Sequence, residues 1–489
     1  MNATQPALTR PAWTWPLVML AATLVLPSAC KSDPPGGTGS MSGSDPTQGE
    51  SESDDAEGPQ FECMPGEVRC SGQAFLETCA PTGLEWVSEP CDLNEFCAPC
   101  GQDGTCAQDR CVGPCEIEAG LPSSAGCSFI VNRQLHLEET EPDGLVVTNP
   151  NDDLAAAVQF YRTPEGKRKE EAVGSPRILE PGESTLFELD ASFVLGNSSM
   201  FRTGGTYRVE SDVPVIAYQH SPLVTFTGND SSMLLPETTL RRDYVVYSFS
   251  PHAAQVDGKG EPSYFEIVAL EDFTEVEWTP PVDTAGTGVN IDFVPAGQTS
   301  PVLNMNRFDT VRIAASANFQ ENSFLRDVSG TVIHANKPIA VVGASRCSRV
   351  PVRTEEGMEQ GFCDPLQEML IPLDYWGERY VAAHPPIRNQ ERHFWRIYSG
   401  SNNVKVVATG NIACTEDIIT AENCEAPNEF DGEGCILEKR GSWIQVDVEN
   451  RCSFFLNSNN TGPFMPVGYL QSSRQIGEPT SEATDAGDP

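Results

Sequence analysis

Basic residues are scarce in this sequence. Its 489 residues include 31 lysines and arginines against 70 aspartates and glutamates, so the formal net charge is −39. Nucleic acid phosphates and anionic lipid headgroups attract clustered Lys and Arg, and a strongly acidic chain repels them. We therefore expect no nucleic acid partner and no electrostatic attachment to a membrane surface.

Long apolar runs are almost absent as well. The one that stands out, Leu17–Leu26, has the length of a signal-peptide core and is too short for a membrane-spanning helix, which needs about 20 apolar residues. Small residues then lead to Cys30, a pattern typical of a bacterial lipoprotein signal, although Pro27 stands where Leu is usual. We predict a signal peptide over residues 1–29 and lipidation of Cys30. An ordinary secretory signal, and hence a secreted protein, is the alternative.

Catalytic motifs are missing too. There is no Gly-x-Ser-x-Gly elbow, no His-Glu-x-x-His zinc helix and no Gly-rich phosphate loop. The six histidines stand singly, so structural roles are favoured over catalysis for His136, His220, His252, His334, His384 and His393. The many carboxylates leave a glycosidase-like acidic pair open as an alternative. We expect a non-enzymatic protein without a cofactor.

Cysteine, by contrast, is abundant. Setting Cys30 aside, sixteen cysteines remain, an even number in each of two groups, and an exported chain uses them as disulfides. The first group is Cys63, Cys70, Cys79, Cys91, Cys97, Cys100, Cys106, Cys111, Cys115 and Cys127. The second is Cys347, Cys363, Cys414, Cys424, Cys435 and Cys452. Cys97 and Cys100 have redox or zinc spacing, but the lack of a nearby histidine and the uneven spacing favour structural bridges.

Composition divides the chain into segments. Residues 30–60 are Gly, Ser, Pro and acid, which cannot bury enough apolar surface to order, so we expect a disordered acidic tether. Residues 61–126 have few aliphatic residues and form the Cys-rich module, which its disulfides must hold together. A β domain is predicted over 127–475, followed by a disordered tail over 476–489.

The β domain contains an internal repeat. Each copy opens with an apolar strand, an Asn, Asp or Gly cluster and a second strand, which we interpret as a hairpin, at 145–160, 265–278 and 395–407. Each closes with a strand pair that has a proline before the last strand, at 205–218, 330–342 and, in a worn form, 454–469.

The connectors between copies repeat as well. Met233–Pro236 with Tyr244–Ser248 matches Met369–Pro372 with Tyr380–His384, both shifted by 136 positions. No 3.6-residue apolar period is evident. We predict an all-β protein of tandem β-sandwich-like units over about 127–222, 223–345 and 346–473, which pack on one another through the connectors.

These residues carry a family resemblance. The strings Ser329–Ser345, Cys363–Leu373 and Trp376–Val381 resemble the IgGFc-binding protein N-terminal domain, and the likeness extends over about 145–472. Pro365 stands where the family usually has histidine. The resemblance implies an extracellular β-rich binding scaffold without catalysis, and a Cys347–Cys363 bridge. We do not carry over immunoglobulin binding, because the resemblance places no binding residue on this chain.

Other candidate features have weaker signals. Three pairings are open among the last four cysteines, and Cys424–Cys435 nested in Cys414–Cys452 is favoured. Oxygen-rich turns at 149–153 and 431–434 could bind calcium but equally suit β-turns. Four tryptophans could form a sugar platform, although core packing is favoured for Trp278, Trp376, Trp395 and Trp443. Asn197, Asn229 and Asn459 begin glycosylation acceptor patterns.

Together these features predict an outer-membrane or cell-surface lipoprotein that contacts the membrane only through its lipid. Its β domain would recognise and adhere to an extracellular protein or glycan. A secreted hydrolase with an unrecognised acidic site and a structural cell-envelope protein are the alternatives.

Overall fold

The computed structural model describes residues 62–472 apart from short internal segments, and the chain divides into two units between Gln60 and Phe61. The predicted signal peptide, Cys30, the tether and the 476–489 tail lie outside the described residues, as do Cys106, Cys414, His252 and Asn197. The internal segments left out are 93–94, 101–107, 120–121, 137–139, 191–197, 224–227, 252–261, 289, 317–325, 352–362, 387–391, 411–414, 420–423, 425–428 and 450–451.

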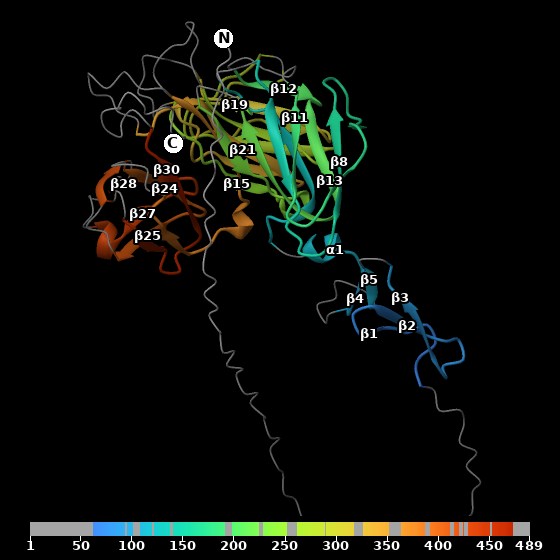
Figure 1. Cartoon of the computed structure of the whole chain (residues 1–489). Coiled ribbons are helices and arrows are strands. Elements are labelled where there is room, and N and C mark those ends of the chain that lie inside the picture. The colour runs from blue at the N-terminus through green and yellow to red at the C-terminus, as the bar shows by residue number, and fades with distance from the viewer. Residues whose placement is uncertain are drawn as a thin grey trace, which may run out of the picture. The chain divides into compact units, whose positions relative to one another are not determined.

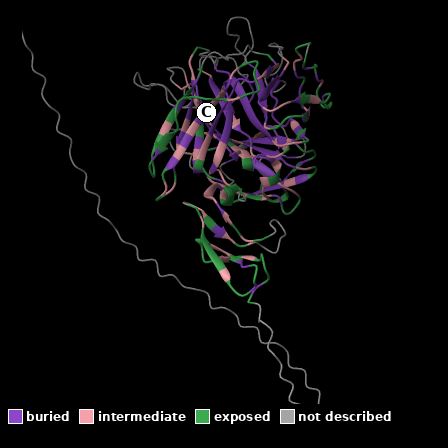
Figure 2. Cartoon of the chain, turned by 90° about the vertical axis from the view of Figure 1, so that its right-hand side faces the viewer, coloured by how far each residue is buried: buried purple, intermediate pink, exposed green. Residues whose placement is uncertain are grey.

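The Cys-rich module is built from short strands and disulfides. Its elements are β1 (Val68–Ser71), β2 (Phe75–Cys79), β3 (Trp86–Pro90), β4 (Phe96–Ala98), β5 (Arg110–Val112) and the helix α1 (Pro114–Ala119). The structure pairs Cys63 with Cys79, Cys70 with Cys97, Cys91 with Cys111, and Cys115 with Cys127. Cys97 therefore bonds to Cys70 and not to Cys100, so these two do not form a redox pair. Figure 2 shows the module mostly exposed, unlike the β units.

Three β units follow, coloured from teal to red in Figure 1. The first unit comprises β6 (Gly126–Asn132), β7 (Asp143–Thr148), β8 (Ala156–Thr163), β9 (Glu171–Ala172), β10 (Arg177–Leu179), β11 (Ser184–Leu189), β13 (Thr206–Ser221) and β14 (Asp230–Met233). Between β11 and β13, β12 (Met200–Thr203) pairs with a strand of the second unit. The all-β prediction is confirmed, since α1 is the one α-helix of the described chain.

The second and third units repeat this series of strands. The second has β15 (Asp243–Val245), β16 (Ser263–Ala269), β17 (Thr274–Thr279), β18 (Leu303–Met305), β19 (Asp309–Ala314), β20 (Val332–Ala335), β21 (Ile339–Ser348) and β22 (Asp364–Met369). The third has β23 (Arg379–Ala382), β24 (His393–Ser399), β25 (Val404–Gly410), β26 (Thr415–Ile419), β27 (Cys435–Leu437), β28 (Trp443–Val448), β29 (Phe454–Asn457) and β30 (Phe464–Leu470). Short helices η2 (Glu237–Thr239) and η4 (Leu373–Tyr375) follow equivalent prolines in the connectors, and η6 (Glu429–Glu433) precedes β27.

The strand connectivity is the same in all three units. One sheet has the order β15-β20-β17-β18 in the second unit and β23-β29-β25-β27 in the third, and the other has β19-β16-β21 and β28-β24-β30. In the first unit β13 serves both layers, because its first half pairs with β6 and β8 and its second half with β7 and β14. The register shifts between Glu210 and Val215, where Pro214 stands. The third unit therefore has a complete set of strands, although its sequence repeat is degenerate.

The hairpin interpretation was wrong. The strands predicted at 145–160, 265–278 and 395–407 exist, but the two strands of each segment do not pair with each other. In the second and third units they lie in different sheets, and in the first unit they pair with opposite halves of β13. β16 pairs with β19 and β21, whereas β17 pairs with β18 and β20. The turn at Phe273, whose φ is 58°, carries the chain from one sheet to the other. Alternating burial shows which side chains face the core and does not identify the neighbouring strand.

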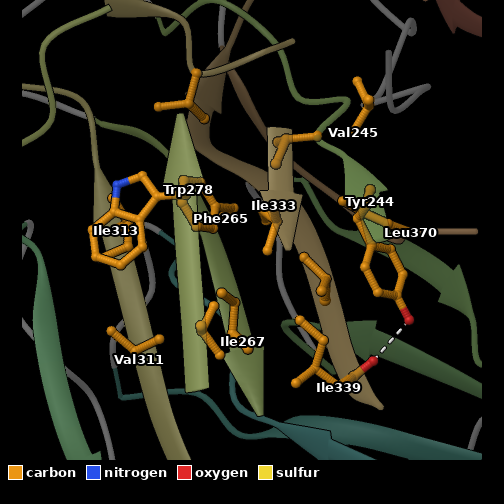
Figure 3. Packing of buried hydrophobic residues seen from close by; sticks show 14 of the residues in the cluster. Tyr244, Val245, Phe265, Ile267, Trp278, Val311, Ile313, Ile333, Ile339 and Leu370 are labelled. Carbon is orange, nitrogen blue, oxygen red and sulfur yellow. Dashed lines mark hydrogen bonds between the residues drawn. The ribbon is translucent and has the colours of Figure 1, made fainter. Parts of the chain in front are cut away.

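Hydrophobic cores join neighbouring units. The core of the second unit, shown in Figure 3, includes Phe265, Trp278 and Ile333, and the Tyr244 hydroxyl donates to the Ile339 carbonyl at 2.7 Å. The same cluster takes in Trp376, Tyr398 and Met465 from the connector and the third unit, and a second cluster extends from the first unit to Val268 and Met369. The β units therefore share their cores. Among the described residues, no helix is long and apolar enough to cross a membrane.

Candidate binding surface

The tryptophans and histidines singled out from the sequence hold the fold together. Trp278 and Trp376 are buried in the second core, while Trp395 and Trp443 pack against core clusters. They do not form an exposed sugar platform.

Four of the described histidines, His136, His334, His384 and His393, also have side-chain contacts that suit a structural role. His136 is buried beside Asp143, with His136 Nε2 3.0 Å from Asp143 Oδ1. Exposed His334 has its Nδ1 2.7 Å from Asp243 Oδ1. In the described part of the chain, neither of these contacts joins two histidines into a possible catalytic group.

The turn at 149–153 uses its polar atoms internally. The Asn149 side chain donates to the carbonyl oxygens of Leu154 and Leu179, at 2.8 and 2.9 Å, and its own oxygen accepts the Asn151 backbone N–H at 3.0 Å. These bonds show the role that asparagine ordinarily has in a turn. Across the described chain, no three His, Cys, Asp or Glu side chains are grouped closely enough to hold a metal ion.

An acidic pair lies where the two connectors meet. Asp230 on β14 and Glu368 on β22 line a cavity of about 130 Å³ with Tyr247 and Tyr469. Burial, with Asp230 nearby, raises the pKa of Glu368 to about 8. Ser232 Oγ donates to Glu368 at 3.2 Å, and an Asp230 carboxylate oxygen accepts the Gln367 backbone N–H at 2.6 Å. Ligand pockets usually exceed about 300 Å³, so this pair holds β14 against β22 rather than surrounding a substrate.

A larger groove lies on the third unit, at the strand pair β23–β29. Its volume is about 710 Å³, which is within the range of ligand sites. Val381 and Phe455 stand directly opposite each other in the strand register and are 56% and 59% exposed. The next opposed pair on the same face is Arg379 and Asn457, and the lining is completed by Glu378, Tyr380, Leu456, Asn459 and Asn460.

The groove combines an apolar pair with a polar margin. Arg379 supplies a guanidinium, and the asparagines supply amide donors and acceptors beside the exposed Phe455 ring. Asn459 and Asn460 both have φ between 50° and 60°, which turns the chain sharply after β29. An exposed aromatic residue with Arg and amide groups beside it is the composition of a protein-recognition surface.

Sequence analysis did not single out these groove residues. A signal was present in the consecutive Phe454 and Phe455, because neighbouring residues of a strand face opposite sides of the sheet. The structure buries Phe454 in the core and leaves Phe455 on the outer face. Sequence alone does not say whether another unit covers that face.

None of the cysteines in the predicted disulfides of the β domain belongs to the groove strands β23 and β29, although Cys452 stands two residues before β29. The structure joins Cys347 to Cys363 and Cys424 to Cys435, the pairs that the resemblance implied and that we favoured. Cys100 and Cys452 are disulfide-bonded as well.

Comparison with known proteins gives a match to a protein family. Residues 230–489 match the model of the family described as IgGFc binding protein, which covers more than half of the chain. No curated protein and no solved structure matches.

The chain therefore belongs to the IgGFc-binding protein family, and the resemblance seen in the sequence is confirmed. This membership indicates a non-enzymatic binding role toward an extracellular protein. The match begins at β14, so the rest of the first unit lies outside it although its strands are connected like those of the other two.

Proposed function

We propose that this protein is an exported, surface-anchored binding protein whose third unit recognises an extracellular protein ligand through the β23–β29 groove. The exposed Val381–Phe455 pair is the observation that carries the proposal. The equivalent opposed pair of the second unit is Val245 and Val332, and Val245 is fully buried there. Large apolar side chains left exposed as a pair on an otherwise polar strand surface mark interaction sites.

A protein ligand is favoured over a glycan because the centre of the groove contains an aliphatic side chain, Val381, beside an aromatic one, Phe455. A sugar would stack on Phe455 alone, whereas a protein side chain can cover Val381 and Phe455 and leave Arg379 for a carboxylate. Adhesion through such a surface requires neither a cofactor nor an acidic catalytic pair.

Binding can be tested with a Phe455→Asp variant of the full chain. The probes are immobilised purified extracellular proteins, including immunoglobulin Fc, and a matched set of extracellular polysaccharides. Val302→Asp is the control, because Val302 is 52% exposed on the second unit and lies outside the groove. We expect Phe455→Asp to weaken binding to a protein probe at least about tenfold, as hot-spot truncations do, and the control to bind like the wild type. Unchanged binding by Phe455→Asp would exclude the groove.

Anchoring is tested separately, through Cys30. A dual-chain lipid anchor retains a protein on a membrane, so Cys30→Ala should move the protein from the membrane fraction to the soluble fraction. The measurement is fractionation of the producing cells with and without detergent. A Cys30→Ala protein that still needs detergent for release contradicts lipidation as the anchor.

A further inference from the structure

The groove strand β23 stands at the edge of its sheet. The sheet has the order β23-β29-β25-β27, so within the described chain β23 pairs along its length with β29 alone. The Ser458 N–H donates to the Glu378 carbonyl at 3.0 Å, which makes these two opposed residues a hydrogen-bonded pair. Hydrogen-bonded pairs alternate along an antiparallel ladder. The backbone groups of Arg379 and Val381 therefore point away from β29, toward the free edge.

This edge has unsatisfied hydrogen-bonding capacity. Among the described residues, none bonds to the outward N–H and C=O groups of Arg379 and Val381. The edge is also short. At its start the Phe464 N–H of β30 donates to the Gly377 carbonyl at 2.9 Å, and beyond its end stand Pro385 and Pro386, which have no N–H. Another chain could pair with β23 over a few residues only, and such a free edge is a template for that pairing.

The equivalent edge of the second unit is covered by the protein itself. Strand β15 is also an edge strand, in the order β15-β20-β17-β18. The connector helix η4 contacts β15, and its Leu373 packs on the core that contains the fully buried Val245. Gly441 of the third unit lies over Val332, so that a β-carbon on Gly441 would be 3.3 Å from a Val332 methyl group. In the described part of the third unit no helix follows β30, so β23 has no counterpart of η4.

The charged position of the edge also differs between the two units. In the second unit Asp243 and His334 stand opposite each other and satisfy one another, with Nδ1 and Oδ1 2.7 Å apart. The equivalent pair of the third unit is Arg379 and Asn457. The Arg379 guanidinium has no ion pair or hydrogen bond with any residue that the structure describes. A carboxylate is the group that a guanidinium binds most strongly, so the ligand is expected to supply one.

We propose that the groove binds its ligand as an added strand, an extended segment of the extracellular protein that pairs with the β23 edge. Its backbone would bond to the outward groups of Arg379 and Val381, as in other cases of strand addition. Side chains two residues apart lie on one face of a strand. The segment would therefore place an apolar residue beside Val381 and Phe455 and an acidic residue, two positions away, beside Arg379.

This inference rests on the proposed function and specifies the form of its ligand. A second copy of β23 is a poorer occupant than a foreign segment. The groove face of β23 carries Arg379 and Val381, so pairing β23 with itself would bring two guanidinium groups to one face and supply no carboxylate there. Like charges placed close together across a strand pair are destabilising.

The first experiment identifies segments that bind. The probe is a phage-displayed library of random peptides of about twelve residues, long enough for an added strand. It is selected on the immobilised full chain and depleted on the Val381→Asp variant. We expect the enriched peptides to share an acidic residue two positions from an aliphatic or aromatic one. Synthetic copies should bind the wild type and lose affinity at least about tenfold toward Arg379→Ala, as at other binding hot spots.

The second experiment separates backbone pairing from side-chain contact. Arg379→Pro removes the outward N–H in addition to the guanidinium, and proline is tolerated where an edge N–H faces away from the ladder. We expect Arg379→Pro to bind the selected peptides at least about tenfold more weakly than Arg379→Ala, since proline removes a main-chain bond as well. Near-ultraviolet circular dichroism and the melting temperature verify that both variants fold. N-methylation of the peptide is independent of folding: it should abolish binding at alternate amides and be tolerated at those between.

The outcomes distinguish this inference from the proposed function. Equal binding by Arg379→Ala and Arg379→Pro, with N-methylation tolerated throughout the peptide, overturns strand addition, and so does a selection that enriches no peptide. Neither result affects the proposed function, which the protein probes and Phe455→Asp test separately. A wild-type dimer in light scattering that Arg379→Pro dissociates would assign the edge to a second copy. Peptide binding that requires removal of residues 476–489 would assign it to the tail of the same chain.

Discussion

The two junctions between β units each bury one charged side chain at the same strand position, but the two charges have opposite signs. At the first junction Glu266 is the buried anion, held by Arg312 of its own unit and by Asn132 of the preceding one. At the second junction the equivalent residue is the cation Arg396, held by Gln445 of its own unit and by Asp327 of the preceding one. The strand positions agree, and the sign of the charge does not.

This difference specifies which unit follows which. If the third unit docked on the first, Arg396 would lose Asp327, its carboxylate partner. If the second unit docked on another copy of the second unit, Glu266 would face Asp327, which is also an acid. Buried charges without a partner are strongly unfavourable, so the wrong orders are disfavoured by desolvation and repulsion. Burial by itself lowers the pKa of Arg396, but Asp327 and neighbouring tyrosines raise it above its usual value, so the guanidinium stays charged.

The second junction is also the more aromatic of the two. Phe249 and Trp443 lie on the Arg396 guanidinium, with ring centroids 4.0 and 4.3 Å from its central carbon. Cation–π contacts of a desolvated guanidinium are worth about 2 kcal/mol, which adds to the ion pair. The first junction relies on amide and carboxylate hydrogen bonds with one aromatic contact, Arg312 over Tyr264 at 5.0 Å.

Removing the third unit should have the largest effect. A chain that ends at Ile371 loses Trp376, Tyr398 and Met465 from the core of the second unit. It therefore exposes a contiguous apolar surface, and we expect aggregation, measured as the soluble fraction after expression and by light scattering. A chain shortened only by residues 476–489 serves as the control and should stay soluble. Soluble, monomeric protein from the shorter chain would show that the junction is dispensable.

The second largest effect should come from a substitution that disrupts the second junction in the full chain. Arg396→Ala leaves Asp327 buried without its cation, which should lower the free energy of unfolding by about 3–5 kcal/mol. Denaturant unfolding followed by tryptophan fluorescence measures the loss. Arg396→Met combined with Asp327→Leu should recover much of it, because both charges are then absent. Equal losses in the single and double variants would contradict the ion-pair account.

The first junction should be less sensitive. Glu266→Gln keeps the side-chain shape and the hydrogen bonds from Asn132 but leaves the Arg312 charge without its carboxylate. We expect a loss of about 2–3 kcal/mol, smaller than at Arg396 because no aromatic contacts are lost at the same time. The comparison uses the same unfolding experiment, with the exposed Glu275→Gln as control. A greater loss than that of Arg396→Ala would reverse the ranking of the junctions.

The smallest effect should come from Glu368, between the connectors. Its pKa of about 8 lies above the unfolded value near 4.5, so the folded state binds the extra proton between these values. Its contribution to stability is therefore full below pH 4.5 and is lost as the pH rises through 8. We expect Glu368→Gln to raise stability at pH 6 by about 1 kcal/mol relative to its effect at pH 5, because each pH unit between the two pKa values is worth about 1.4 kcal/mol. Identical pH profiles for wild type and variant would refute the shift.

Much of the site organisation follows from local sequence. The prolines at 236 and 372 each begin a short helix, and the strands after them start seven residues further on. The cysteine spacing similarly indicated a module that disulfides hold, because so few aliphatic residues cannot form a core. The groove escaped notice because its strand residues, Arg379 to Val381 and Phe455 to Asn457, are more than 70 positions apart in the chain.

The sequence by itself therefore determined the β class, the repeated units and the family of this protein, since alternation, turns and repeats are local properties. Only the tertiary structure decided which strands pair and which faces are covered. The segment from Phe265 to Trp278 was predicted as one hairpin, but its two strands belong to two sheets. The turn between them fits either arrangement, so pairing with distant strands decides which one forms. Likewise Val146 on β7, Glu266 on β16 and Arg396 on β24 have equivalent strand positions, yet docking on the preceding unit buries Glu266 and Arg396 fully and leaves Val146 half-buried.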